Sequence, residues 1–129
     1  MSIMSPIKLI ECPRDAMQGI GPFIPTDLKV EYLNALLRVG FDTIDIGSFV
    51  SPKAIPQLAD TAEVLARIDR SGTTSKLLVI VANERGAEQA VEQESVTYLG
   101  YPFSISETFQ QRNTNTTIVS KCGRVDPHR

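Results

Sequence analysis

Four short apolar runs rich in β-forming residues alternate with longer segments of helical periodicity along the chain. The runs are Ile7–Cys12, Thr43–Gly47, Leu77–Val81 and Val96–Gly100. Strands that alternate with helices are typical of parallel sheets, whose right-handed crossovers lay the helices over the sheet. The pattern therefore predicts an α/β fold, either an open doubly wound sheet or an arc of a closed barrel. Periodicity alone does not separate the two.

Three helices are predicted between these strands. Thr26 is the expected N-cap of the first, which ends near Gly40; the second runs from about Gln57 to Ser71, and Asn83 opens the third. The side chains expected to face the sheet are Leu28, Leu33, Leu36 and Leu37, then Leu58, Ala62, Leu65 and Ile68, then Ala87, Ala90 and Val91.

Composition limits the class of protein. The 129 residues are 42% hydrophobic and carry a net charge of −2, which suits one domain with a core and offers no basic surface for nucleic acid. The start lacks a secretory signal, no apolar run is long enough to span a membrane, and two cysteines fit a reducing compartment. We expect a cytoplasmic protein with no nucleic-acid or membrane partner.

The end of the chain differs from the rest. Residues 118–129 lack an apolar stripe and finish in turn-forming residues, although a further helix is expected after the fourth strand. We therefore predict one folded unit over residues 1–117 and an atypical C-terminal tail over residues 118–129.

The loop after the first predicted strand places a cation beside a carboxylate. Parallel α/β sheets bind ligands at the carboxyl ends of their strands, where this loop lies. Asp15 is able to bind a hard divalent cation through its oxygens, and Arg14 to stabilise a developing oxyanion. In the alternative interpretation Asp15 caps a turn and Arg14 faces solvent.

Two acids are predicted on neighbouring strands. Side chains alternate along a strand, so Glu11 and Asp45 are expected to face the lumen of a barrel together. Buried carboxylates need hydrogen bonds, a metal or a shifted protonation equilibrium. The pair fits an active site, but a structural salt bridge from one acid to Arg14 explains it equally well. Cys12 is expected to pack in the apolar interior.

Other polar residues have weaker signals. The hydroxyls of Ser48–Lys53 are able to contact a polar substrate, but a turn leading into a helix explains them too. Asn83 is expected to cap a helix, and Glu107 to be a solvated carboxylate. The single histidine, His128, excludes an imidazole-rich metal site built from this chain alone, and Gly19–Gly21 forms no phosphate-binding fingerprint.

These residues also carry a resemblance. Glu11-Cys12-Pro13-Arg14-Asp15-Ala16-Met17-Gln18 resembles the opening signature of the hydroxymethylglutaryl-CoA lyases, a family of metal-dependent TIM-barrel lyases. The resemblance runs from about Lys8 to Thr117. It continues in Ile24–Thr26, Ser48–Lys53, Pro56–Asp60, Glu63–Leu65 and Arg112-Asn113. It implies a partial (β/α)₈ TIM barrel, about the first four β/α units, with parallel strands.

The family cleaves 3-hydroxy-3-methylglutaryl-CoA to acetyl-CoA and acetoacetate in leucine degradation and ketone-body metabolism, with Mg²⁺ or Mn²⁺. The resemblance implies an acyl-CoA substrate and a homo-oligomer in the full-length form. It implies catalytic roles for Arg14, Gln18 and Asp45, substrate binding by Arg14 and Ser48, a metal bond from Asp15 and a luminal acid in Glu11. Asp45 stands where the family usually has a glutamate.

The chain also departs from the family. In the family, a His-x-His pair and an asparagine complete the metal site, and a catalytic cysteine lies in a Gly-rich loop. This sequence has no counterpart of these residues, and the surroundings of Cys122 do not match that loop. A lysine that often follows the signature is replaced in Gly19–Pro22. We therefore expect a truncated chain that is inactive on its own.

Two other interpretations stay open. The chain is alternatively a non-catalytic half-barrel that self-associates or pairs with a complementary half, because its outer strands lack partners. A flavodoxin-like sheet would instead place the first strand in the middle.

Overall fold

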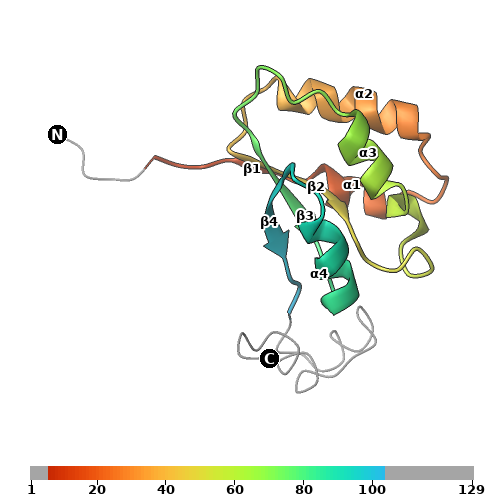
Figure 1. Cartoon of the computed structure of the whole chain (residues 1–129). Coiled ribbons are helices and arrows are strands. Elements are labelled where there is room, and N and C mark those ends of the chain that lie inside the picture. Colours follow the sequence, from red (N-terminus) through yellow and green to blue (C-terminus); the bar gives the residue numbers. More distant parts are fainter. Residues whose placement is uncertain (1–5, 104–129) are drawn as a thin grey trace, which may run out of the picture.

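The computed structural model describes residues 6–103, which form a parallel sheet covered by helices (Figure 1). The elements are β1 (Ile10–Glu11), α1 (Pro13–Gln18), α2 (Thr26–Leu37), β2 (Thr43–Ser48), a 3₁₀ turn η1 (Pro56–Leu58), α3 (Thr61–Arg67), β3 (Lys76–Ile80), α4 (Glu84–Val91) and β4 (Val96–Gly100). The predicted tail, residues 118–129, lies outside the described residues.

The four strands pair in parallel in the order β1-β2-β3-β4, so each strand lies beside the next one along the chain. A flavodoxin-like sheet would have β1 between other strands, and β1 lies at an edge, which excludes that interpretation. Consecutive parallel strands with intervening helices form an arc of a (β/α)₈ barrel. The predicted fold class is confirmed.

The core lies between one face of the sheet and helices α2, α3 and α4, which gather on that side (Figure 1). Leu77 and Val79 of β3 are almost fully buried, whereas Leu78 and Ile80, which alternate with them, are half-buried on the other face. The core side chains are Leu33, Leu37, Ile44, Ile46, Val64, Leu65, Leu77, Val79, Val81 and Ala90. The helix-free face is therefore the side that a closed barrel would turn inward.

The buried face of α2 differs from the prediction. Leu33 and Leu37 are buried as expected, but Leu28 is 54% exposed and Lys29 is 2% exposed. Residues spaced by four lie on one helical face, so Lys29 continues the row of Leu33 and Leu37. The expected cap is also different, because Pro25 holds the cap position and Thr26 begins the helix.

Three further side chains are placed differently from the prediction. Ala62 and Val91 are exposed, because Val64 and Leu65 fill the contact of α3 with the sheet and Ala90 that of α4. Cys12 lies beyond the short β1 and is exposed, where packing in the interior was expected. No helix among residues 6–103 is both long and apolar enough to cross a membrane.

Strand β2 carries one extra residue relative to β3. Asp45 pairs with Leu78 and Gly47 with Val79, so Ile46 has no partner of its own and forms a β-bulge. Thr61 at the start of α3 fastens this bulge, since its hydroxyl donates to the Leu58 carbonyl at 2.8 Å and accepts from the Ser48 amide at 3.1 Å. The last residue of β2 is therefore tied to the first residue of α3.

We expect Gly47→Ala to destabilise the fold by about 1–3 kcal/mol, because overpacking a close contact has this effect. A β-carbon at Gly47 would lie 2.5 Å from the Thr61 methyl carbon. Urea denaturation measures the loss, and Gly19→Ala is the matched control because no atom lies within 4 Å of its β-carbon position. Adding Thr61→Ser, which removes the methyl group, is expected to recover part of the stability; no recovery would contradict this explanation.

Candidate functional site

Helix α1 follows β1 directly and lays Arg14 across the carboxylate of Asp45. The Arg14 Nε donates to both Asp45 oxygens at 3.1 and 3.0 Å, and Nη2 donates to Oδ2 at 2.8 Å. The side chains are 16% and 7% exposed. A bidentate pair of this kind fixes the plane of the guanidinium group.

Gln18 holds the other end of the same guanidinium group. Its Oε1 accepts a hydrogen bond from Arg14 Nη1 at 2.8 Å, one helical turn along α1. A guanidinium group has five N–H donors. Arg14 uses three of them on Asp45 and Gln18, so one donor on each terminal nitrogen remains for a ligand oxygen.

Asp15 is the candidate metal ligand, and its carboxylate is 76% exposed. It lies 3.8 Å from Arg14 Nη1, too far for a hydrogen bond but close enough for charge attraction. Within residues 6–103, no three acidic, histidine or cysteine side chains come together as a metal site. The described residues alone therefore do not fit a divalent cation; Asp15 offers one oxygen ligand.

Ser48 lies on the same face of the sheet as Asp45 because of the bulge. Residues three apart on a regular strand point to opposite faces, but the bulge at Ile46 adds one position between them. Asp45 pairs with Leu78 and Ser48 with Ile80, and these two β3 residues share the helix-free face. Ser48 is 3% exposed, and its Oγ accepts from the Val50 amide at 3.2 Å.

Glu11 lies at a different register position from Asp45. It pairs with Ile44, whose side chain is fully buried in the core on the helix side. Paired residues of parallel strands share a face, so Glu11 and Asp45 occupy opposite-face positions, and the expectation that both face the lumen is wrong at this register. The Glu11 carboxylate accepts from the Cys12 amide at 3.1 Å.

Cys12 lies near the charged side chains of Asp45 and Arg14. Although the residue is exposed, partial desolvation raises the pKa of its thiol, and the negative charge of Asp45 raises it further. A raised pKa keeps the thiol protonated and weakly nucleophilic at neutral pH. The surroundings of Cys12 therefore do not activate its thiol.

The structure contains a buried ion pair between Lys29 and Asp60 that the sequence did not predict. Lys29 Nζ donates to Asp60 Oδ1 at 2.7 Å and to the Gln57 carbonyl, and Asp60 Oδ2 accepts from the Thr26 hydroxyl at 2.7 Å. Hydrophobic periodicity counts apolar residue types only, so it assigns a lysine to the exposed face. The four-carbon stem of Lys29 nevertheless packs on the buried face of α2 as a leucine would. The nearest signal was the Pro56–Asp60 motif of the family resemblance.

The remaining polar residues singled out in the sequence lie outside the Arg14–Asp45 site. Asn83 caps α4, since its side-chain oxygen accepts from the Gly86 amide at 2.9 Å, which confirms the prediction. Lys53 is exposed in the turn after β2. Glu107, Cys122 and His128 lie outside the described residues.

No family model matches the chain, but curated relatives do. The chain is 35% identical over 121 residues to the cytoplasmic 3-hydroxy-3-methylglutaryl-CoA lyase of Rattus norvegicus, covering 93% of the chain and 35% of that enzyme. It is 37% identical to the 3-hydroxy-3-isohexenylglutaryl-CoA/hydroxy-methylglutaryl-CoA lyase of Pseudomonas aeruginosa, covering 98% of the chain and 42% of that enzyme. The chain thus spans well under half of the length of these relatives.

Solved structures agree with the sequence matches. The HMG-CoA lyase of Acinetobacter baumannii, in complex with coenzyme A and 3-methylmalate, superposes with a TM-score of 0.84 at 36% identity over 91% of the chain and 38% of its own. The HMG-CoA lyase of Brucella melitensis superposes with a TM-score of 0.83 at 35% identity. The match covers 94% of this chain and 44% of that enzyme. Sequence and fold agree over most of the chain, which is therefore similar to a part of the full-length fold of the hydroxymethylglutaryl-CoA lyases.

Proposed function

We propose that this chain supplies the Arg14–Asp45 half of a carbon–carbon lyase site that cleaves 3-hydroxy-3-methylglutaryl-CoA to acetyl-CoA and acetoacetate. One observation carries the proposal. Arg14 is held by three hydrogen bonds to Asp45 and one to Gln18, yet keeps two N–H groups for a ligand oxygen. Preorganised donors of this kind stabilise charge that develops in a transition state.

Each proposed role follows from the chemistry of a retro-aldol cleavage. The thioester oxygen becomes an enolate oxygen, and the free N–H groups of Arg14 bind it. Asp45 and Gln18 keep the guanidinium group in place, and Ser48 on the same face contacts the substrate.

We propose that Asp15 is one ligand of a divalent cation, Mg²⁺ or Mn²⁺, whose other ligands come from outside the described residues. Its exposed carboxylate supports this, because a metal ligand must be open to the rest of the site. One carboxylate binds Mg²⁺ weakly, since dedicated sites pool several oxygens. Purified 1–129 is accordingly expected to show no lyase activity with added Mn²⁺, and turnover of the thioester would contradict this.

A chimera tests the proposed function directly. Residues 6–103 replace the matching segment of the Pseudomonas aeruginosa relative, and lyase activity on 3-hydroxy-3-methylglutaryl-CoA is measured. We expect an active chimera that loses activity with Arg14→Ala or Asp15→Asn. Asp27→Asn is the matched control, since the Asp27 carboxylate is 85% exposed on α2. A folded chimera without activity, or full activity of the Arg14→Ala chimera, would overturn the proposal.

The cellular context belongs to the proposal as well. We propose a cytoplasmic enzyme of leucine degradation with an acyl-CoA partner, and a homo-oligomer in the full-length form. The coenzyme A complex of the relative from Acinetobacter baumannii supports the acyl-CoA partner. Named relatives include both cytoplasmic and mitochondrial enzymes, so fractionation of cells that produce the protein tests the location.

The exposed edges of the sheet favour a second function, that of a self-associating half-barrel. Leu9 and Ile10 at the β1 edge are 63% and 56% exposed, and Tyr98 and Leu99 on β4 are each 42% exposed. Apolar unpaired edges invite association. Size-exclusion chromatography of 1–129 with light scattering is expected to show dimers or larger species; a stable monomer would contradict the half-barrel function.

A further inference from the structure

Helix α1 carries both Arg14 and Gln18, but it is too short to keep its shape alone. It has 6 residues, and isolated helices shorter than roughly 12–15 residues are marginal in water. Pro13 and Met17 are buried and fix the side of the helix that faces the protein. Gln18, at the last position, is exposed, so water competes for the side chain that accepts from Arg14. Contacts outside the helix therefore have to set the position of its end.

The loop that follows α1 does not hold this end by packing. Residues 19–25 include Gly19 and Gly21, and beyond their chain neighbours no atom lies within 4 Å of the position that a β-carbon would take on either. Glycine loses more conformational freedom on folding than any other residue. Ile20 and Phe23 of the same loop are 46% and 52% exposed. Such a loop needs hydrogen bonds to keep one conformation.

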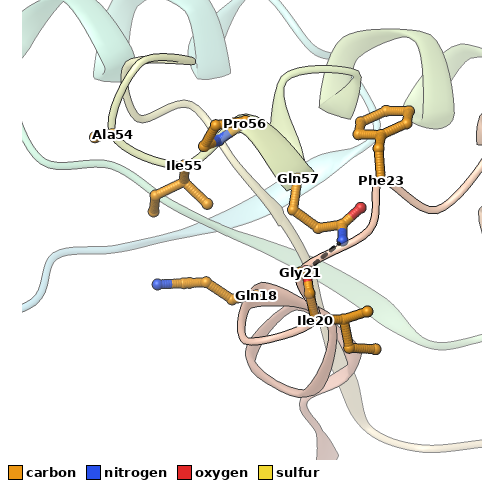
Figure 2. A pocket seen from close by; sticks show the side chains of 8 residues that line it. All are labelled: Gln18, Ile20, Gly21, Phe23, Ala54, Ile55, Pro56 and Gln57. Atoms are coloured by element: carbon orange, nitrogen blue, oxygen red, sulfur yellow. Dashed lines mark hydrogen bonds between the residues drawn. The ribbon is translucent and has the colours of Figure 1, made fainter.

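Gln57 of η1 supplies these hydrogen bonds. Its Nε2 donates to the carbonyls of Ile20 and Pro22, each at 2.9 Å, and its Oε1 accepts from the Ile24 amide at 2.8 Å. Figure 2 shows the side chain turned toward the loop, with the hydrogen bond to Ile20 dashed. Gln57 is 6% exposed, so these bonds are sheltered from water. One buried amide thus holds three backbone groups of the loop.

The position of Gln57 is fixed in turn by the buried ion pair of Lys29 and Asp60. The Gln57 carbonyl accepts from Lys29 Nζ, which donates to Asp60 Oδ1 at 2.7 Å. The same cation lies 4.2 Å from the centre of the Phe23 ring, which belongs to the loop. The loop after α1 is therefore fastened to its surroundings both through the Gln57 amide and through the Phe23 ring.

We propose that Gln57 is a positioning residue of the lyase site, which acts through α1 and Gln18 on the guanidinium group of Arg14. The inference rests on the proposed function, in which the free N–H groups of Arg14 bind the enolate oxygen. Asp45 accepts from Nε and Nη2, whereas Gln18 accepts from Nη1. Release of the end of α1 would therefore loosen Nη1 and leave the pair with Asp45 in place. Gln57 sets where one donor points without touching the substrate.

Side-chain NMR of arginine in isotope-labelled 1–129 tests the inference without any activity. We expect Gln57→Met to raise the rate at which the two protons on Arg14 Nη1 exchange places by about tenfold, the change that one hydrogen bond to a charged group supports. The Nε resonance, which reports the pair with Asp45, is expected to stay in place. Gln57→Asn keeps the amide but withdraws it by one methylene, so it is expected to raise the rate less, and it replaces Gln57→Met if that variant does not fold.

Two control variants on α4 separate positioning from a general loss of stability. Gln89→Met makes the same substitution at an exposed glutamine, and Ala90→Gly weakens the helix at a buried position away from the site. Neither is expected to change the exchange at Arg14 Nη1. An unchanged rate in a folded Gln57 variant, or an equal rise with Ala90→Gly, would overturn the inference.

A double-variant cycle in the chimera shows whether Gln57 acts through Gln18. We expect Gln57→Met to lower kcat about tenfold with KM nearly unchanged, less than the roughly hundredfold loss on removal of an oxyanion donor. Because both changes loosen the same nitrogen, Gln57→Met is expected to lower kcat little further when Gln18→Ala is already present. Additive losses would overturn the inference. An inactive unsubstituted chimera would instead reject the proposed function, and the NMR result on Arg14 would still decide whether Gln57 positions it.

Discussion

Replacing Lys29 with methionine is expected to lower the free energy of unfolding by about 3–5 kcal/mol, the range for breaking a buried ion pair. Methionine keeps most of the apolar stem, so the loss comes from the charge. Asp60, 10% exposed, would keep only the Thr26 hydroxyl as a partner, and the Gln57 carbonyl would lose its donor. Urea denaturation followed by circular dichroism measures the change.

Two further variants separate this explanation from simple repacking. Lys53→Met, at an exposed lysine, is expected to change stability by less than about 0.5 kcal/mol. The double variant Lys29→Met with Asp60→Leu is expected to be more stable than Lys29→Met alone, because no buried charge is left unpaired. A double variant that is less stable than the single one would contradict the ion-pair account.

Asp45→Asn is expected to lower the free energy of unfolding by about 2–4 kcal/mol, since it breaks a largely buried charged pair while keeping its shape. Arg14 would lose three hydrogen bonds to a carboxylate and retain Gln18. In the active chimera we expect the same change to lower kcat, because the guanidinium group would no longer be held. Thermal unfolding and steady-state kinetics measure the two effects.

Asp15→Asn is the matched control for stability, being one residue along the chain from Arg14. Its carboxylate is 76% exposed and makes no close hydrogen bond, so unfolding is expected to stay nearly unchanged. On the proposed function the same variant still loses lyase activity in the chimera. Equal destabilisation by Asp15→Asn and Asp45→Asn would show that neither the burial of Asp45 nor its pairing explains the effect.

The fold followed from the sequence to the level of element order. Three of the four predicted strands are close to their observed bounds. The apolar residues of β2 and β3 are buried against helices, whereas β4 is found from its β-forming residues although it is largely exposed. The first strand is shorter than predicted, Ile10–Glu11 in place of Ile7–Cys12, since it pairs with β2 only over those two residues. Apolar composition predicts a strand, but the extent of pairing depends on the neighbour.

The candidate site was predicted from the sequence only in part. A salt bridge from one of two acids to Arg14 was one of the two open interpretations, and Asp45 forms it. The shared face of Glu11 and Asp45 was wrong, because alternation within each strand does not set the register between strands. Lys29 was missed for a different reason: its burial depends on Asp60, 31 positions away along the chain. Long-range partners leave no periodic signal.

The bulge at Ile46 means that the number of residues in β2 matters as much as their identity. If all residues from Asp45 to Ser48 formed a regular ladder, Ser48 would lie three positions after Asp45 and would turn its hydroxyl toward the helices, away from Asp45. A relative with one residue fewer at this point would place the two side chains on the same face without a bulge, so a one-residue gap in an alignment here marks a change of strand geometry and not of the chemistry at the strand end.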